Sequence, residues 1–383
     1  MPGLNKKTAL FTTDAPLPLA CGASLPGFTL AYETYGEMTP ERDNVILLFH
    51  ALTGSQNAAG ETLSTGVPEA DSRWTSECTT GWWDAFVGPG LAVDTDQFFV
   101  VCANYIGGCY GSTGPSSPHP EDGQPYGSRF PRIAMRDIVE SQVRLLDHLE
   151  VEKTHAVIGN SIGGMLALEF ATRHAARTHL VVPVATSMSS GALHRLMNFE
   201  QILAIESDPN FSGGDYYGKD QQPPDSGLAL ARMISHKTFI HVDMLERRAR
   251  DEVSGGNGAL SWYPLSRSLE SYMLHQGQKF TSRFDANTYL RVIDAWQQFD
   301  LLAGRTTAEV FAPSAHQSYL IFSIDSDVCF YPDDQGEITQ ALEANGIPAM
   351  HHTVHSEKGH DSFLLEPELY APQISYFLSG KTG

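Results

Sequence analysis

The residues with the clearest chemical potential are Gly-Asn-Ser-Ile-Gly at positions 159–163. Apolar, β-type residues precede this pattern at 155–158, and a helix-like stretch follows it at 165–172. A tight turn from a strand into a helix exposes its central side chain, and the flanking glycines let strand and helix approach closely. The pattern therefore predicts that Ser161 is a nucleophile for acyl transfer. The alternative is an ordinary glycine-rich turn.

A serine nucleophile needs a histidine base and a carboxylate that orients it, in the chain order serine, acid, histidine on this type of sheet. Asp327 follows the apolar run at 318–324, and His360 follows the last β-type run. Both are predicted strand ends, where the sites of open α/β sheets lie. We expect Asp327 and His360 to form a triad with Ser161, and Asp325 is the direct competitor of Asp327.

Acyl transfer also needs two N–H groups that bind the oxyanion of the tetrahedral intermediate. One comes from the residue after the nucleophile, here Ile162, and the other from the loop after an early strand. The apolar run at 45–49 leads into His-Ala-Leu-Thr-Gly at 50–54. We therefore expect the second donor to be the Leu52 N–H, with Ala51 as the alternative.

A group of histidines near the end of the chain suggests a metal site at first sight: His351, His352, His355 and His360. In a strand, His351 and His355 would share one face while His352 would lie on the other. No carboxylate stands at ligand spacing beside them, so we predict that the protein binds no metal.

The elements that must position these residues alternate between strands and helices. β-type runs stand at 28–35, 45–49, 98–102, 155–158, 180–185, 318–324 and 349–355, and an amphipathic helix opens at Pro131. This alternation is typical of a mostly parallel sheet flanked by helices. Between 187 and 311 helical segments dominate, around 193–205, 227–240, 269–276 and 286–302. We expect an α/β catalytic domain built from residues 1–186 and 312–383, interrupted by a helical lid domain at 187–311.

The composition excludes several classes of protein. The chain has 383 residues, of which 42% are apolar and 18% charged, as in a globular protein with a sizeable core. A net charge of −20 argues against nucleic acid and anionic membranes as partners. No apolar run is long enough for a membrane helix, and the N-terminal stretch does not resemble a secretory signal. Five scattered cysteines without a CxxC pair indicate reduced thiols in a cytoplasmic protein.

With these motifs in place, the chain resembles the homoserine O-acyltransferases of the α/β-hydrolase superfamily, and most closely the homoserine O-acetyltransferase group. The similarity extends from about residue 28 to about residue 377. The blocks that carry it are HALTG (50–54), NYIGGCYGSTGPSS (104–117), PYGSRFP (125–131), RDIVESQVRLLDHL (136–149), SIGGMLALEF (161–170), DPNF (208–211), ESYMLHQGQKF (270–280), RFDANTYL (283–290), SDVCFYP (326–332) and GHDSFLLE (359–366).

The resemblance implies an α/β-hydrolase fold with Ser161 as nucleophile, Asp327 as acid and His360 as base. It further implies that Arg232, in GLALARM, binds the carboxylate of the amino-acid substrate and that Asp361 binds its amino group. A planar guanidinium suits bidentate recognition of a carboxylate. From the residues alone, Arg232 would be taken for a surface helix arginine and Asp361 for a loop carboxylate.

The implied reaction moves an acetyl group from acetyl-CoA to the hydroxyl of L-homoserine, for methionine biosynthesis, by a ping-pong mechanism without a bound cofactor. Relatives that transfer succinyl tend to carry arginine two residues after the catalytic aspartate. This chain has Cys329 there, which favours acetyl-CoA, whereas Ser112 replaces a threonine that many acetyl-transferring relatives carry. The family commonly forms dimers through the lid, so we expect a homodimer.

Several alternatives stay open at this point. The donor could be succinyl-CoA, and the acceptor could be L-serine or another alcohol. A plain esterase would use the same triad, and a non-catalytic binding protein would use the same fold. Because CoA carries phosphates while the chain has a net charge of −20, we also predict a local cationic rim on the lid side of the site.

Overall fold

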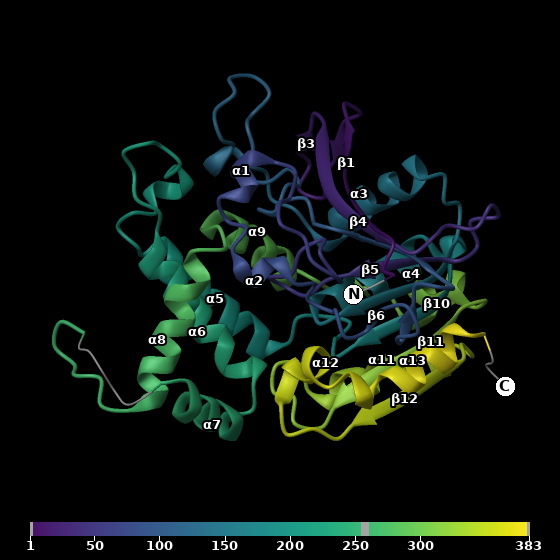
Figure 1. Cartoon of the computed structure of the whole chain (residues 1–383). Coiled ribbons are helices and arrows are strands. Elements are labelled where there is room, and N and C mark those ends of the chain that lie inside the picture. The colour runs from purple at the N-terminus through teal and green to yellow at the C-terminus, as the bar shows by residue number, and fades with distance from the viewer. Residues whose placement is uncertain (1–2, 254–259, 381–383) are drawn as a thin grey trace.

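A sheet of eight strands forms the centre of the molecule in the computed structural model, which describes residues 3–253 and 260–380 (Figure 1). The strand order is β1-β4-β8-β5-β9-β10-β11-β12. β1 and β4 pair antiparallel, β4 is antiparallel to β8, and the strands from β8 to β12 pair in parallel. The bounds are β1 Lys6–Thr13, β4 Phe28–Tyr35, β5 Val45–Phe49, β8 Phe99–Ala103, β9 Thr154–Asn160, β10 Thr178–Val184, β11 Ser318–Ile324 and β12 Ala349–Val354. Two short ribbons pair β2 Leu17–Pro18 with β3 Ser24–Leu25, and β6 Val87–Gly88 with β7 Val93–Asp94.

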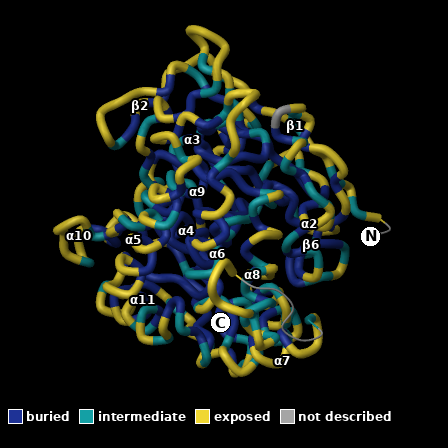
Figure 2. The backbone as a smooth tube through the Cα atoms, turned by 90° about the vertical axis from the view of Figure 1, so that its left-hand side faces the viewer, coloured by how far each residue is buried: buried dark blue, intermediate teal, exposed yellow. Residues whose placement is uncertain are grey.

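The central strands are apolar because both faces of the sheet are covered. All five residues of β5 are buried, and they alternate between two core clusters. Val45, Leu47 and Phe49 belong to the larger cluster, while Ile46 and Leu48 belong to the smaller one, as the two-residue period of a strand requires. The larger cluster includes residues of α3 (Met135–His148), α4 (Ile162–Arg173) and α11 (Pro332–Ala344), and the smaller one includes residues of α13 (Ala371–Leu378). Figure 2 shows buried backbone at the centre of the molecule and exposed backbone mainly at its periphery.

The chain between β10 and β11 is helical, as expected. Its helices are α5 Ala192–Glu206, α6 Asp225–Phe239, α7 Val242–Glu252, α8 Ser268–Thr281, α9 Ala286–Gln297 and α10 Thr307–Phe311. α5 packs against α6, and α6 packs against α8, to one side of the sheet (Figure 1). The larger core cluster continues into this insertion through Met197, Leu228 and Tyr289. The division into a catalytic domain and a lid domain therefore stays a prediction, with one core running through both parts.

Several predicted elements end at other residues than expected. The helix predicted from Pro131 begins at Met135, because Ala134 keeps an extended backbone and its N–H donates to Asp137 Oδ2 at 2.8 Å. The helix predicted at 286–302 ends at Gln297, because the chain beyond it forms a β-bridge from Asp300 to Ser189.

The remaining helices are short. They are α1 Pro68–Asp71, α2 Ser76–Thr79 and α12 Ser362–Leu365, and the 3₁₀ turn η5 Gly359–Asp361 lies just before α12. In the part of the chain that the structure describes, no helix is long and apolar enough to cross a membrane. All five cysteines are free thiols, and four of them are buried.

Candidate active site

Ser161 lies at the tight turn between β9 and α4, in the middle of the sheet. Its backbone has φ 58° and ψ −125°, a conformation that residues other than glycine rarely adopt. A Cβ at Gly159 would collide with the Gly163 carbonyl, and a Cβ at Gly163 would collide with the Phe49 carbonyl. Glycine is therefore required on both sides of the turn, and the backbone strain is concentrated at Ser161.

Asp327 and His360 arrive from the ends of the neighbouring strands β11 and β12. The distance from Asp327 Oδ2 to His360 Nδ1 is 2.6 Å. Asp327 Oδ1 accepts from the N–H groups of Cys329 and Phe330 at 2.7 and 3.0 Å. These backbone bonds fix the carboxylate, so the imidazole that it holds has one orientation.

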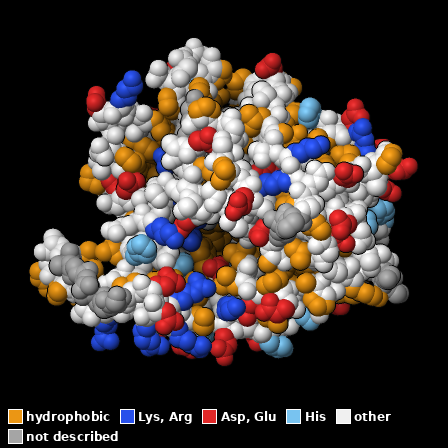
Figure 3. Space-filling model, in the orientation of Figure 1, with side chains coloured by type: hydrophobic (Ala, Val, Ile, Leu, Met, Phe, Trp, Pro, Cys, Tyr) orange, Lys and Arg blue, Asp and Glu red, His pale blue; other side chains and the backbone are white. Residues whose placement is uncertain are grey.

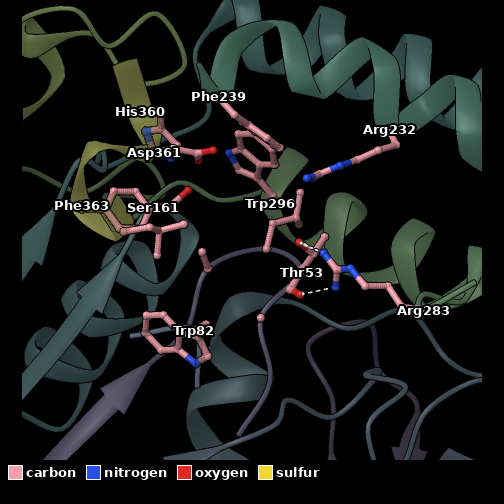
Figure 4. Close-up of a pocket in the computed structure, with 14 residues that line it drawn as sticks. Thr53, Trp82, Ser161, Arg232, Phe239, Arg283, Trp296, His360, Asp361 and Phe363 are labelled. Atoms are coloured by element: carbon pink, nitrogen blue, oxygen red, sulfur yellow. Dashed lines mark hydrogen bonds between the residues drawn. The ribbon is translucent and has the colours of Figure 1, made fainter. Parts of the chain in front are cut away.

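His360 presents its other nitrogen to the site. Nε2 is buried and has no hydrogen-bond partner among the described residues. The ring stacks on Phe330 at a centroid distance of 5.3 Å and meets Phe363 edge-on at 5.1 Å. Ser161 lines the same pocket as His360 (Figure 4). The arrangement leaves Nε2 available to exchange a proton with a group at Ser161.

The environment of His360 favours its protonated form. Burial lowers the pKa of His360, but Asp327 and, more weakly, Asp361 raise it by more, so the pKa lies above the ordinary value of 6.5. Asp327 thus stabilises the imidazolium that forms when His360 accepts a proton.

Asp325, the competitor of Asp327, is directed elsewhere. Its Oδ2 lies 2.8 Å from His355 Nδ1, and its Oδ1 accepts from the Ser356 N–H at 3.0 Å. Asp325 and His355 are both exposed. The carboxylate that orients His360 is therefore that of Asp327.

The pocket at Ser161 has a volume of about 200 Å³. It lies between the 50–54 loop that follows β5, the inserted helices, and the turn that carries His360 (Figure 4). The charged or titratable side chains in its lining are Arg232, Arg283, His360 and Asp361. Two arginines against one carboxylate give this pocket a local charge opposite to the net charge of the chain. On the face shown in Figure 3, basic as well as acidic side chains border the hollow at the middle of the molecule.

Arg232 projects from α6 into the pocket (Figure 4). Its guanidinium carbon lies 5.2 Å from the centre of the Phe239 ring and 5.0 Å from that of Phe280. Burial, and then the nearby Arg283, lower the pKa of Arg232. A half-buried cation between two rings and beside another cation favours an anionic group in the pocket, such as a carboxylate.

Asp361 lines the same pocket from the turn that carries His360. Burial raises the pKa of its carboxyl group, while His360, Arg232 and Arg248 act to lower it. Arg232 and Asp361 thus present opposite charges on two sides of one small cavity, an arrangement complementary to a zwitterion (Figure 4).

The two predicted oxyanion donors also border Ser161. Ile162 is the first residue of α4, so its N–H has no acceptor within the helix. Leu52 lines the pocket, and its N–H donates to no backbone acceptor of the described residues. The preceding carbonyl, Ala51 O, accepts from the Gly54 N–H at 3.0 Å and lies 2.8 Å from His50 Nδ1. Because C=O and N–H of a trans peptide point in opposite directions, the Leu52 N–H points away from those groups.

The histidines near the C-terminus do not point to a common position where they could share a metal ion. His351 Nε2 lies 3.0 Å from Ser323 Oγ, and His355 contacts Asp325. Within residues 3–253 and 260–380, no group of three or more His, Cys, Asp or Glu side chains is arranged to hold a metal ion.

The sequence reasoning missed one charged residue of the pocket, Arg283. It lies in the RFDANTYL block, which carried the resemblance but received no role. The sequence feature that could have pointed to it is the aromatic pair Phe280 and Phe284 on either side of the arginine. The aromatic lining residues Trp82, Phe239 and Trp296 were missed as well.

Comparison with known proteins gives consistent matches. Residues 44–367 match the family described as alpha/beta hydrolase fold. A homoserine O-succinyltransferase of Alkalilimnicola ehrlichii is 42% identical over 370 residues, which cover 96% of this chain and 93% of the relative. A homoserine O-acetyltransferase of Natronomonas pharaonis is 40% identical over 366 residues, which cover 94% of this chain and 88% of the relative. The names of the two relatives differ in the acyl group.

Solved structures share the architecture. A homoserine O-acetyltransferase from Bacillus anthracis aligns with a TM-score of 0.84 at 24% identity and covers 97% of both chains. The esterase E22 aligns with the same TM-score at 25% identity, covering 97% of this chain and 100% of its own. The fold predicted from the sequence, a mostly parallel sheet flanked by helices, is confirmed.

Proposed function

Because this chain belongs to the homoserine O-acyltransferase family within the α/β hydrolase fold, we propose that it transfers an acetyl group from acetyl-CoA to L-homoserine. The reaction is a cytoplasmic step of methionine biosynthesis and passes through an acyl-Ser161 intermediate. One observation supports the proposal most strongly: Ser161 and His360 share a cavity of about 200 Å³ with Arg232 and Asp361. The cavity therefore combines a nucleophile and its base with a pair of opposite charges that can bind an amino acid.

In the first half-reaction His360 Nε2 takes the proton of the Ser161 hydroxyl as its oxygen attacks the thioester carbonyl. The N–H groups of Leu52 and Ile162 bind the oxyanion. The C–S bond then breaks, CoA leaves as the thiol with the proton from His360, and an acetyl ester remains on Ser161. Asp327 stabilises the imidazolium in between.

In the second half-reaction L-homoserine binds with its carboxylate at Arg232 and its amino group at Asp361. This places its hydroxyl near the ester. His360 takes the hydroxyl proton, the oxygen attacks the ester carbonyl, and the proton passes to Ser161 as its oxygen leaves. Since the two substrates react in turn with one serine, the mechanism is ping-pong.

Cys329 supports acetyl as the group transferred, because it stands two residues after Asp327, where relatives that transfer succinyl tend to carry an arginine. Burial raises the pKa of this thiol well above its ordinary range, so it is uncharged. A succinyl group would bring a carboxylate, which is costly to bury without a cation. Arg283 is the other cation of the pocket apart from Arg232, and its guanidinium already contacts Thr53, Tyr110 and Glu77.

The same triad could serve an esterase, as the likeness to E22 illustrates. Transfer requires that water reaches the acyl-enzyme less readily than the acceptor does. We expect acetyl-CoA alone to release one CoA per site and then to react slowly. Rapid continuous hydrolysis without homoserine would favour the esterase.

One assay tests the proposed function. Purified protein is mixed with acetyl-CoA or succinyl-CoA and with L-homoserine or L-serine, and the released thiol is followed. We expect the highest kcat/KM for acetyl-CoA with L-homoserine. Faster release from succinyl-CoA would reassign the donor, and no homoserine-dependent release from either donor would overturn the proposal.

Replacing Arg232 should damage acceptor binding more than acylation. A hydrogen-bonded ion pair with a carboxylate contributes about 1.5–3 kcal/mol, so Arg232→Ala should lower kcat/KM for homoserine roughly 10- to 150-fold. The burst of CoA from acetyl-CoA alone should change much less, since the donor's acetyl group carries no carboxylate. Arg250→Met removes an exposed arginine of α7 and serves as the control. An unchanged KM for homoserine in Arg232→Ala would contradict the assignment.

We also propose that the protein is a homodimer through α5. Four apolar side chains of this helix are exposed at helical spacing: Leu193, Leu196, Phe199 and Leu203. The stripe continues across an apolar hollow to Leu230 of α6, which is 48% exposed. Two copies related by a two-fold axis would cover this stripe with the same stripe of the partner.

The double substitution of Leu196 and Phe199 by Asp should give a monomer in sedimentation analysis, because two buried carboxylates per copy would oppose contact. Leu63→Asp alters a side chain that is 82% exposed outside the insertion, and should leave the dimer intact. A monomeric wild-type protein at micromolar concentration would refute the dimer.

A further inference from the structure

The connection between α8 and α9 joins the inserted helices to the catalytic body at Arg283. This side chain reaches the loop after β5, where Nη1 donates to Thr53 O at 3.2 Å and Nη2 lies 3.4 Å from Thr53 Oγ1. Nη1 also lies 3.0 Å from the Tyr110 hydroxyl, which donates to Arg283 O at 2.7 Å. Nε is 3.3 Å from Glu77 Oε2. Arg283 is therefore fixed from both its backbone and its side chain.

The guanidinium remains charged in this setting. Burial acts to lower the pKa of Arg283, but Tyr110, Cys78 and Glu77 raise it by more. The Phe280 ring lies against it at 5.0 Å. The charged guanidinium of Arg283 therefore donates its hydrogen bond to the carbonyl oxygen of Thr53.

Two peptide groups connect that carbonyl to the Leu52 N–H. Thr53 O and the Gly54 N–H belong to one peptide, and the Gly54 N–H donates to Ala51 O at 3.0 Å. Ala51 O and the Leu52 N–H belong to the second of these peptides, the one that joins Ala51 to Leu52. In each trans peptide the C=O and N–H point in opposite directions, so the chain runs from the guanidinium through both peptides and ends at the Leu52 N–H.

Chains of hydrogen bonds polarise one another in a protein interior. We propose that Arg283 is a positioning residue for acyl transfer: through Thr53, Gly54 and Ala51 it orients and polarises the Leu52 N–H toward the oxyanion. The inserted helices thereby contribute to the chemistry at Ser161 as well as covering it. This inference rests on the assignment of Leu52 as an oxyanion donor, and deepens the proposed function.

The role of His50 agrees with this arrangement. Burial lowers the pKa of His50 to about 4, so the ring is neutral and can donate from Nδ1 to Ala51 O at 2.8 Å. The Tyr105 hydroxyl donates to His50 O at 2.6 Å, and the two rings stack with centroids 3.7 Å apart. The carbonyl of the Ala51–Leu52 peptide thus accepts from two donors, His50 Nδ1 and the Gly54 N–H. The second donor belongs to the peptide whose carbonyl accepts from Arg283.

The test uses p-nitrophenyl acetate, which acylates a serine nucleophile whatever the acceptor. Complete loss of one oxyanion donor costs about 10²–10³ in rate, so weakening it through Arg283→Met should slow acylation roughly 10- to 100-fold. The KM for the ester should change little. Arg283→Lys keeps a cation near Glu77 but not the planar contact with Thr53, and should recover only part of the rate.

A vibrational measurement separates positioning from loss of structure. The ester carbonyl of the acyl-enzyme sits between the oxyanion donors, so its stretching frequency should rise in Arg283→Met as those bonds weaken. Lys279→Met removes the other cation that pairs with Glu77, without a contact to the loop, and should keep the wild-type rate and frequency. Wild-type acylation and frequency in folded Arg283→Met, or equal effects in Lys279→Met, would overturn the inference. Absence of homoserine-dependent CoA release would refute only the proposed function, because the ester reaction tests Arg283 independently.

Discussion

Replacing Ser161 with alanine is expected to lower kcat for homoserine acetylation by about 10⁶-fold, the scale on which triad enzymes lose activity with their serine. The remaining groups, His360 and the two N–H donors, have no atom to which the acetyl group can be transferred. The first half-reaction then fails as well as the second.

The experiment is most direct without the acceptor. Wild-type protein mixed with acetyl-CoA alone should release one CoA per site, and the peptide that contains Ser161 should gain the mass of one acetyl group. Ser161→Ala should show neither. Ser282→Ala removes a hydroxyl from the surface end of α8 and should behave as wild type. Homoserine-dependent turnover at the wild-type rate by Ser161→Ala would contradict the covalent mechanism.

Asp327→Asn should lower kcat about 10⁴-fold, because the amide favours the wrong tautomer of His360 and no longer stabilises the imidazolium. The variant should also change the pH profile. His360 must be neutral at Nε2 to accept a proton, and its pKa is raised above 6.5. Wild-type kcat/KM is therefore complete above that raised pKa and is lost as the pH falls through it. Without the carboxylate the pKa falls, so the acid limb of the variant should move to lower pH.

Asp325→Asn is the matched control, since the two carboxylates lie two residues apart after the same strand. The Asp325 carboxylate contacts the exposed His355 and the Ser356 backbone and is directed away from His360, so its substitution should preserve both the rate and the acid limb. A larger loss in Asp325→Asn than in Asp327→Asn would reverse the assignment.

The groups of the site that follow from local sequence could be predicted. Ser161 stands in a strand–turn–helix pattern, which its own neighbours reveal. Asp327 and His360 stand at predicted strand ends, but local sequence left Asp325 open as an alternative, and the preference for Asp327 came from the family resemblance. The strands with the strongest apolar runs, such as β5 and β11, have the expected bounds.

Features that depend on contacts between distant residues escaped prediction. The role of Arg283 depends on Thr53, which is distant in the chain. The helix α11 was missed because its buried face includes Gln335 and Thr339 beside Ile338 and Leu342, which weakens the apolar periodicity. β1 was missed because it is an edge strand in which Phe11 is the one buried residue and the others are exposed or half-buried.

The order of the strands has a consequence for how the protein becomes active during synthesis. β10 pairs with β11 across the whole helical insertion, and Asp327 and His360 follow β11 and β12. A nascent chain that has left the ribosome only as far as the insertion already contains Ser161, the proposed nucleophile, but neither Asp327 nor His360, its proposed acid and base. Such a fragment also has an unpaired β10 edge, where another chain could add. Under the proposed mechanism, acyl transfer can begin only when the last strands join the sheet, and we expect unfinished chains to leave cellular thioesters intact.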